Sequence, residues 1–249
     1  MDITDKAIIV TGGCGGLGTP VVRALAERGA SVGVLDFDPG GLERLAAEVG
    51  SVMPLDCDLT DPADVDKSVA AFFEVQGRID GLVNNAGILY NEPLVKFGPK
   101  GLQRHGRESW RKVMSLNLDA VFETTSAVVE RMIQRRTRGV VVNISSIAAQ
   151  GNPGQSAYAA SKAAVEALTK TWALELGVWG IRCACVAPGY TGTGSTHAVM
   201  NEDTLDHIVS EVPLRRLGEP EEIASAVLFC LENDFMNGKV LAVDGGLVL

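Results

Sequence analysis

The sequence predicts an α/β fold in which a single doubly wound, parallel, seven-stranded sheet carries helices on both faces. Short apolar runs alternate with amphipathic stretches along all 249 residues, the pattern of repeated strand–helix units. The runs are almost continuously aliphatic, as strands buried on both faces are. We find no linker, internal repeat or alternating hairpin pattern, so residues 1–249 are expected to form one domain.

Each strand is expected where an aliphatic run lies between polar or turn-forming residues. Seven runs qualify: Ala7–Thr11, Ser31–Asp36, Ser51–Asp56, Gly81–Asn84, Val140–Ser145, Ile181–Ala187 and Val240–Val243. Between most of them, apolar residues recur with helical spacing. The expected helices are Leu17–Arg28, Gly41–Val49, Pro62–Gln76, Trp110–Arg135, Ser156–Gly177 and Pro220–Leu231.

Composition restricts the classes of partner. The chain is 46% hydrophobic and 21% charged, with a formal net charge of −9. This acidic balance argues against nucleic acid or an anionic membrane as a partner. The start of the chain does not resemble a signal peptide, and no apolar run reaches the roughly 18 residues of a membrane-spanning helix. Five cysteines and three histidines show no metal-ligand spacing. We therefore expect a cytoplasmic protein with reduced thiols and no metal site.

A glycine-rich loop, Thr11–Gly18 with the sequence TGGCGGLG, follows the first expected strand and opens the first helix. Glycines allow a tight turn and let backbone N–H groups approach a pyrophosphate at the positive end of a helix, as in Rossmann-like folds. Cys14 lies within this loop, where a small residue tolerated in a turn is favoured over an oxidation-sensitive switch. The loop predicts a bound dinucleotide.

Acidic residues at the next strand ends bear on the cofactor. Asp36 ends the second strand, 20 positions beyond Gly16, where a carboxylate accepts hydrogen bonds from ribose hydroxyls. Its charge would repel a 2′-phosphate, and the flanking Gly15 and Phe37 offer no cation, so NAD is predicted rather than NADP. Asp58, after the third strand, is expected either to contact the adenine or to cap the helix beginning near Pro62; the sequence leaves both open.

A pair of reactive side chains lies on the fifth helix. Tyr158 and Lys162 are four residues apart and share one helix face. Ser145 lies 158 − 145 = 13 residues upstream of the tyrosine, at the end of a strand. The carboxyl edge of an open α/β sheet is where such folds bind their ligands.

With these residues in place, the chain resembles the short-chain dehydrogenases/reductases over almost its whole length. The matching motifs are the T-G-x-x-x-G-x-G loop, Asn84–Gly87, Asn117, Ser145, Tyr158-x-x-x-Lys162, Pro188-Gly189 and Val243–Gly246. The resemblance implies an enzyme that moves a hydride between NAD and a secondary alcohol or ketone. It does not indicate the direction of the reaction.

The resemblance also implies residue roles. Tyr158 would be the general acid/base, and Lys162 would lower the phenol pKa and hold the nicotinamide ribose. Ser145 would bind the substrate oxygen, and Asn117 would order a relay water. The full set of implied cofactor contacts is Gly12, Cys14, Gly15, Gly16, Leu17, Gly18, Asp36, Phe37, Asp58, Leu59, Asn85, Ala86, Gly87, Tyr158, Lys162, Pro188, Gly189, Thr191 and Thr193. Thr191 replaces an aliphatic residue of the family pattern.

The substrate itself is not readable from these residues. Ser145, Gln155, Tyr158 and Tyr190 are expected to contact it, with Tyr90 and Gln150 nearby and a lid over about residues 194–212. A non-catalytic dinucleotide sensor would be expected to lack the tyrosine or the lysine. A sugar epimerase or dehydratase would usually have a G-x-x-G-x-x-G loop and a longer C-terminal region. The sequence disfavours both alternatives.

One segment suggests a narrower substrate class. Residues 88–109 form a 22-residue connection that carries Lys96, Lys100, Arg104, His105 and Arg107 against Glu92 and Glu108. A similar insertion occurs in the type II 3-hydroxyacyl-CoA dehydrogenases. The alternative function is therefore a 3-hydroxyacyl-CoA dehydrogenase or 3-oxoacyl-thioester reductase whose cations meet substrate phosphates. A solvated loop or a subunit contact is the competing interpretation.

Two long helices predict self-association. Trp110–Arg135 and Ser156–Gly177 are apolar on more than one face, and the matching helices of the family pair across a two-fold axis. A homotetramer is expected, with a homodimer as the simpler alternative.

Overall fold

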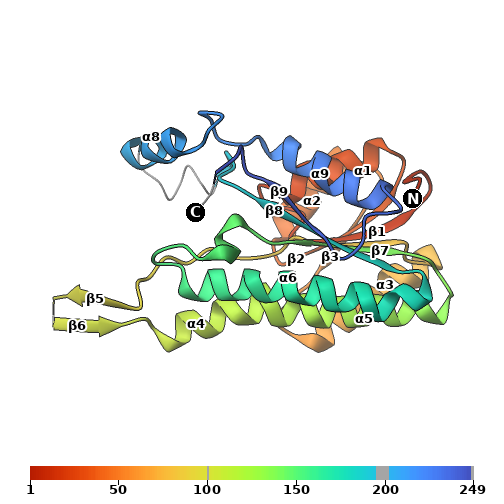
Figure 1. The fold of residues 1–249 in the computed structure, drawn as a ribbon. Coiled ribbons are helices and arrows are strands. Elements are labelled where there is room, and N and C mark those ends of the chain that lie inside the picture. Colours follow the sequence, from red (N-terminus) through yellow and green to blue (C-terminus); the bar gives the residue numbers. More distant parts are fainter. Residues whose placement is uncertain (100, 195–201, 248–249) are drawn as a thin grey trace.

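The sheet is the frame on which the rest of the molecule is built. The computed structural model describes residues 1–99, 101–194 and 202–247 (Figure 1). Seven parallel strands lie in the order β3-β2-β1-β4-β7-β8-β9, which confirms the predicted fold class. Their bounds are β1 Ala7–Thr11, β2 Ser31–Asp36, β3 Val52–Asp56, β4 Gly81–Asn84, β7 Val140–Ile144, β8 Arg182–Pro188 and β9 Val240–Val243.

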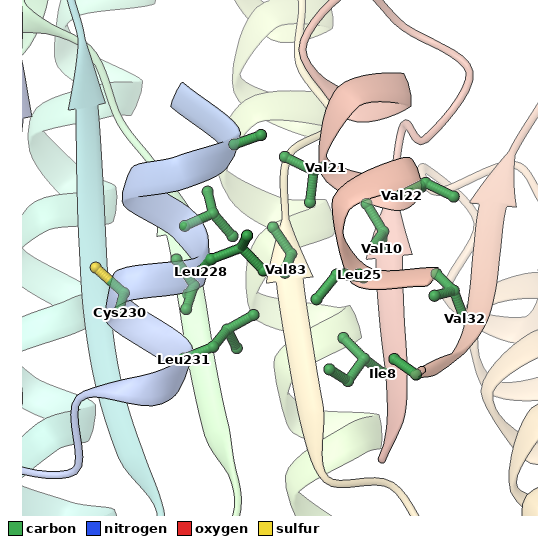
Figure 2. Close-up of a cluster of buried hydrophobic side chains, with 14 of the residues drawn as sticks. Ile8, Val10, Val21, Val22, Leu25, Val32, Val83, Leu228, Cys230 and Leu231 are labelled. Carbon is green, nitrogen blue, oxygen red and sulfur yellow. The ribbon is translucent and has the colours of Figure 1, made fainter. Parts of the chain in front are cut away.

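Helices cover both faces of this sheet, as Figure 1 shows. One layer contains α1 (Gly18–Glu27), α2 (Pro39–Glu48) and α9 (Pro220–Glu232); the other contains α3 (Pro62–Gln76), α5 (Ala120–Gln134) and α6 (Ser156–Leu176). In the first layer, Leu25 and Leu228 converge with Val83 between α1, α9 and the sheet (Figure 2). Each such fully buried aliphatic side chain contributes about 1.5–3 kcal/mol.

The strand order places a crevice at a defined point. The chain runs from β1 outward to β2 and β3, then returns to the other side of β1 with β4. At such a switch point the loops after β1 and β4 diverge to opposite faces of the sheet. The glycine loop and Asn85 both lie at this point, immediately after β1 and β4.

The segment expected as one helix, Trp110–Arg135, is not a single α-helix. It begins earlier, as α4 (Arg107–Met114), passes through a π-helical turn (Ser115–Asp119) and continues as α5. π-Helical turns inside α-helices are rare and occur frequently at functional sites. Asn117 lies in the middle of this turn.

The expectation that the chain contains no hairpin was wrong. β5 (Val95–Gly98) and β6 (Gly101–Arg104) pair antiparallel and form an arm that extends beyond α4 in Figure 1. The alternation of Val95 and Phe97 with polar residues, followed by paired glycines, was the available signal. Register places Val95 opposite Arg104 and Phe97 opposite Leu102. One face of the arm is therefore apolar, and Phe97 is 88% exposed.

The remaining elements include two short 3-10 helices, Ile147–Gln150 and Gly177–Trp179, and α8 (Glu202–Glu211). Within the segment expected to form a lid, 194–212, residues 195–201 lie outside the described residues. In the described ranges, no helix is both long enough and apolar enough to cross a membrane.

Candidate active site

The glycine loop follows a path that side chains would block. Gly12 has φ +62°, and a Cβ there would lie 2.8 Å from the Ala86 Cα. A Cβ on Gly18 would lie 2.9 Å from the Asn85 Nδ2 and collide with the loop backbone. Only glycine avoids these contacts. The loop therefore lies tightly against the segment after β4, with α1 beginning at Gly18, a cradle suited to a pyrophosphate.

Asn85 holds that cradle in place. Its Nδ2 donates to the carbonyl oxygens of Thr11 (3.1 Å) and Gly12 (2.9 Å). The Thr11 hydroxyl in turn accepts from the backbone N–H groups of Asn85 and Ala86, each at 3.1 Å. The Asn85 carboxamide nitrogen thus binds the protein's own backbone and fixes the loop against the segment after β4.

Asp36 lies beside the same loop. Its Oδ2 accepts from the Cys14 N–H (2.9 Å) and its Oδ1 from the Asp38 N–H (3.2 Å). The carboxylate is therefore oriented before any ligand arrives. One cation lies in this region, because an Arg44 nitrogen of α2 is 3.7 Å from an Asp38 oxygen. Its partner is Asp38, so the expectation that no cation offsets the Asp36 charge stays a prediction. Phe37 is 77% exposed.

The Cys14 thiol is not set up for redox chemistry. Burial raises the pKa of this thiol to about 12, and the neighbouring Asp36 carboxylate acts in the same direction. A reactive cysteine needs the opposite shift, toward thiolate at neutral pH. The geometry favours the interpretation of Cys14 as a small residue in a turn.

One of the two interpretations of Asp58 does not hold. Helix α3 is capped by Asp61, whose Oδ1 accepts from the Ala63 N–H at 3.0 Å. The Asp58 carboxylate instead accepts from the backbone N–H and hydroxyl of Thr60 and remains exposed. Leu59, in contrast, is buried. Asp58 is therefore free of a capping role, and its contact with the adenine stays a prediction.

The reactive side chains of α6 reach the opposite part of the crevice. Lys162 is 4% exposed, and its Nζ donates to the Ile144 carbonyl at 2.8 Å. Burial lowers the pKa of this lysine to about 8. The ammonium lies 5.8 Å from the centroid of the Tyr158 ring. A Cβ on Gly87 would lie 3.5 Å from Nζ, so the segment after β4 also borders the lysine.

The Tyr158 phenol lies beside Lys162. Burial raises the pKa of this phenol, and a side-chain hydrogen bond with Ser146 acts in the opposite direction. A phenol beside a buried ammonium can act as a general acid, because the ammonium stabilises the phenolate that remains.

Ser145 forms side-chain hydrogen bonds within the protein. Its hydroxyl lies 2.9 Å from Glu166 Oε1 and 3.2 Å from the Lys162 carbonyl oxygen, and the residue is 2% exposed. The next residue, Ser146, has a side-chain hydrogen bond that lowers the pKa of the Tyr158 phenol. The role of Ser145 at the substrate oxygen stays a prediction, and Ser146 is a second candidate for it.

Asn117 is fully buried in the π-helical turn. Its Oδ1 accepts from the Ile88 N–H (2.8 Å), and its Nδ2 donates to the Ile88 carbonyl (2.9 Å). Both ends of the carboxamide are thus used to fix the segment after β4 against this turn. A Cβ on Gly87 would lie 3.2 Å from the same Oδ1. The Asn117 side chain therefore fixes the backbone that borders Lys162.

Two residues expected at the substrate, Gln155 and Tyr190, bind asparagines of neighbouring loops. Gln155 is 7% exposed; its Nε2 donates to Asn91 Oδ1 (2.9 Å), and its Oε1 accepts from Asn152 Nδ2 (3.2 Å). The same Asn152 nitrogen lies 3.4 Å from the Tyr190 hydroxyl. These contacts join three loops at the sheet edge. Gln155 is therefore part of the wall of the site, and Tyr90 is 38% exposed.

The loop after β8 completes the crevice. A Cβ on Gly189 would lie 2.7 Å from the Asp244 Cα, which fixes the turn that follows Pro188. Thr191 is 6% exposed, and its hydroxyl lies 3.2 Å from the Gly189 carbonyl. Thr193 reaches the glycine loop, where a Cβ on Gly16 would lie 2.7 Å from the Thr193 Cβ. The two halves of the crevice meet here.

A cavity of about 410 Å³ opens beside this set. It lies between the segment after β4 and helix α4, and its lining residues are Ile88, Leu89, Tyr90, Glu108, Ser109, Lys112 and Val113. The wall is largely apolar with a few polar groups, as ligand pockets usually are. The cavity begins one residue beyond Gly87, which borders Lys162.

Known proteins share this architecture. A family model described as Enoyl-(Acyl carrier protein) reductase matches residues 13–248. A 3-oxoacyl-(acyl-carrier-protein) reductase FabG of Thermotoga maritima is 39% identical over 100% of both chains. Carbonyl reductase family member 4 of Xenopus tropicalis is 38% identical over 98% of both. A crystal structure titled gox2181 superposes with a TM-score of 0.89 at 31% identity, over 98% of this chain and 95% of that one.

Proposed function

This chain belongs to the short-chain dehydrogenase/reductase family, and we propose that it transfers a hydride between a nicotinamide dinucleotide and C3 of an acyl thioester. The reaction type rests on one observation: Ser146, Tyr158 and Lys162 converge beside a glycine cradle at the switch point. Relatives named 3-oxoacyl-(acyl-carrier-protein) reductases support a thioester over secondary alcohols in general. They favour the alternative function anticipated from the 88–109 segment.

In the direction of reduction, a bound reduced nicotinamide supplies the hydride. The Ser146 hydroxyl donates a hydrogen bond to the carbonyl oxygen, and the Tyr158 phenol transfers its proton to that oxygen as negative charge develops there. The raised pKa of the phenol keeps the proton in place until it is needed. Lys162 stabilises the phenolate left behind, since a pKa of about 8 leaves this lysine mostly charged at neutral pH.

The Lys162 ammonium has further N–H donors for a second role. An ammonium carries three N–H donors, and the structure uses one for the Ile144 carbonyl. The other two are available to ribose hydroxyls and to a water that returns the proton to Tyr158. Because the Asn117 carboxamide is bound to Ile88, that water would meet the backbone of the π-helical turn.

The substrate class is tested with a matched series. Acetoacetyl-N-acetylcysteamine should be reduced with a kcat/KM at least about 100-fold above that of 2-pentanone, which has the same ketone without the thioester. The crotonyl thioester, which offers a C=C bond instead, should be inert. Equal turnover of both ketones would favour a general carbonyl reductase. Turnover of the crotonyl thioester alone would contradict the proposed chemistry.

We propose NAD(H) as the cofactor because of Asp36. Its carboxylate is fixed by Cys14 and Asp38 at the ribose end of the crevice, where it repels a 2′-phosphate. We expect the kcat/KM for NADH to exceed that for NADPH at least about tenfold, and Asp36→Ser to narrow the ratio. Arg44→Ala is the control, since this arginine pairs with Asp38, whose backbone N–H donates to the Asp36 carboxylate. If the wild-type protein preferred NADPH and the Arg44→Ala variant lost that preference, the cofactor would be NADP(H) and not NAD(H).

The arm provides cations of two kinds. Lys96 is paired with Glu92 Oε1 at 2.9 Å, whereas Arg104 is exposed on the apolar face with Phe97. Lys100 lies outside the described residues. We propose that Arg104 meets phosphates of the thioester carrier. Arg104→Ala should raise KM for acetoacetyl-CoA about fivefold and leave KM for the phosphate-free cysteamine thioester unchanged. An equal rise in KM for both substrates, or no rise for either, would indicate that the arm is solvated or forms a subunit contact.

We also retain a homotetramer as a proposal. Phe122 of α5 is 49% exposed, and Leu174 of α6 is 83% exposed. Both belong to the helices expected to pair between copies. Light scattering that gave a concentration-independent monomer would rule this out.

A further inference from the structure

A third ionisable side chain continues the row formed by Tyr158 and Lys162. Glu166 follows at the next i+4 position of α6, so the three side chains share one face of the helix. The residue is partly buried. Its carboxylate oxygen Oε1 lies 2.9 Å from the Ser145 hydroxyl. The mechanism above assigns no task to this carboxylate.

Ser145 links Glu166 to the end of β7. Its backbone N–H donates to the Val186 carbonyl at 2.8 Å, which holds the residue against β8. A serine hydroxyl has one proton, and the carboxylate competes for it with the Lys162 carbonyl at 3.2 Å. The charge-assisted bond to Glu166 is the stronger of the two. The side chain of Ser145 is therefore directed toward α6.

That direction has a consequence for the neighbouring residue. Ser145 and Ser146 follow the last residue of β7, Ile144, so both side chains project from the same short stretch of backbone. Fixing Ser145 against α6 therefore also fixes the backbone that carries the Ser146 side chain. The Ser146 hydroxyl also accepts from the Ala148 N–H at 3.1 Å, which holds it at the start of a 3-10 helix.

We propose that Glu166 is a positioning residue: through Ser145 it sets the orientation of the end of β7, so that Ser146 meets the Tyr158 phenol. The contacts of Lys162 support the same arrangement. The Lys162 Nζ donates to the Ile144 carbonyl, and the Lys162 carbonyl oxygen lies near the Ser145 hydroxyl. Helix α6 therefore contacts two consecutive residues at the end of β7. The Glu166 carboxylate also lies close enough to the buried Cys185 thiol of β8 to raise its pKa. The carboxylate is thus at the junction of α6, β7 and β8.

The kinetic test uses a double-mutant cycle. Glu166→Leu and Ser145→Ala should each lower kcat about tenfold, while KM and the Kd for NADH change less than twofold. The kcat of the double variant should be no lower than that of either single variant, because both substitutions remove the same hydrogen bond between Glu166 and Ser145. Glu166→Gln should keep most of the activity, since its amide oxygen can accept the same hydrogen bond. Glu175→Leu, on the exposed part of α6, is the matched control.

Normal kcat in Glu166→Leu, or losses that add in the double variant, would overturn the proposal. So would a parallel rise in KM and in the Kd for NADH, which would indicate general damage to the fold.

The inference rests on the proposed function, so a readout that needs no substrate separates the two. The chain contains three tyrosines, and ring-carbon-labelled tyrosine allows the Tyr158 phenol to be titrated by NMR, with Tyr158→Phe for assignment. Because the Ser146 hydrogen bond lowers the pKa of this phenol, Ser145→Ala and Glu166→Leu should both raise that pKa. Glu166→Gln and Glu175→Leu should not. An unchanged Tyr158 titration in Glu166→Leu would refute the positioning role even if the thioester proposal fails.

Discussion

Replacing Tyr158 by Phe is expected to lower kcat by about 10³-fold while NADH binding changes less than threefold. The substitution removes one oxygen, and with it the only proton donor that the mechanism places on the carbonyl; general acid catalysis contributes about 10²–10⁴-fold. The ring itself remains, so the packing against Lys162 is kept. Initial rates and fluorescence titration with NADH measure the two quantities separately.

The matched control is Tyr190→Phe. The Tyr190 hydroxyl lies 3.4 Å from Asn152 Nδ2, and loss of this long hydrogen bond should reduce kcat less than about threefold. Residual activity above a tenth of wild type in Tyr158→Phe would show that another group supplies the proton.

Replacing Lys162 by Met is expected to abolish turnover and yet stabilise the cofactor-free protein. The pKa of this lysine falls from 10.5 in the unfolded chain to about 8 in the folded protein. Between these values the unfolded chain binds more protons, so folding stability rises with pH across this window and the buried charge is a cost below it. The shift corresponds to a cost on the order of 3 kcal/mol. The Ile144 carbonyl left without its donor offsets about 1–2 kcal/mol of the gain.

Thermal unfolding without cofactor measures this effect. At pH 7 the Lys162→Met protein should unfold about 3–6 °C above wild type, given roughly 2–4 °C for each kcal/mol in a chain of this size. The difference should shrink between pH 8 and 9.5, because the wild-type lysine loses its proton there. Lys170→Met, an exposed lysine of the same helix, should show neither effect. A less stable Lys162→Met protein at pH 7 would contradict the account of the buried ammonium.

Sequence patterns predicted the sheet and most helices because burial leaves a continuous signal along the chain. β1 and β4 begin and end where the aliphatic runs Ala7–Thr11 and Gly81–Asn84 do. The glycine loop was predictable for a related reason, since φ at Gly12 and the close approach of Ala86 exclude side chains. In both cases, the requirement leaves a recognisable residue pattern in one continuous stretch of sequence.

The details of the site depend instead on contacts between distant residues. Ser145 and Ser146 are alike in sequence, and only Glu166 and Tyr158, on another element, distinguish their directions. The place of Gln155 in the chain predicts a substrate contact, whereas its carboxamide binds Asn91 and Asn152. Arg44 approaches the Asp36 region through the geometry of α2. Pairings of this kind leave no periodic pattern along the chain.

Hydride transfer to a thioester ketone is tested most directly by an isotope. The protein is given acetoacetyl-N-acetylcysteamine and NADH carrying deuterium at the transferring position of the nicotinamide, and the product is examined by mass spectrometry and NMR. We predict 3-hydroxybutyryl thioester with one deuterium at C3, formed by the wild-type protein and not by Tyr158→Phe. A product without deuterium at C3, or deuterium found only in a reduced crotonyl thioester, would contradict the central claim.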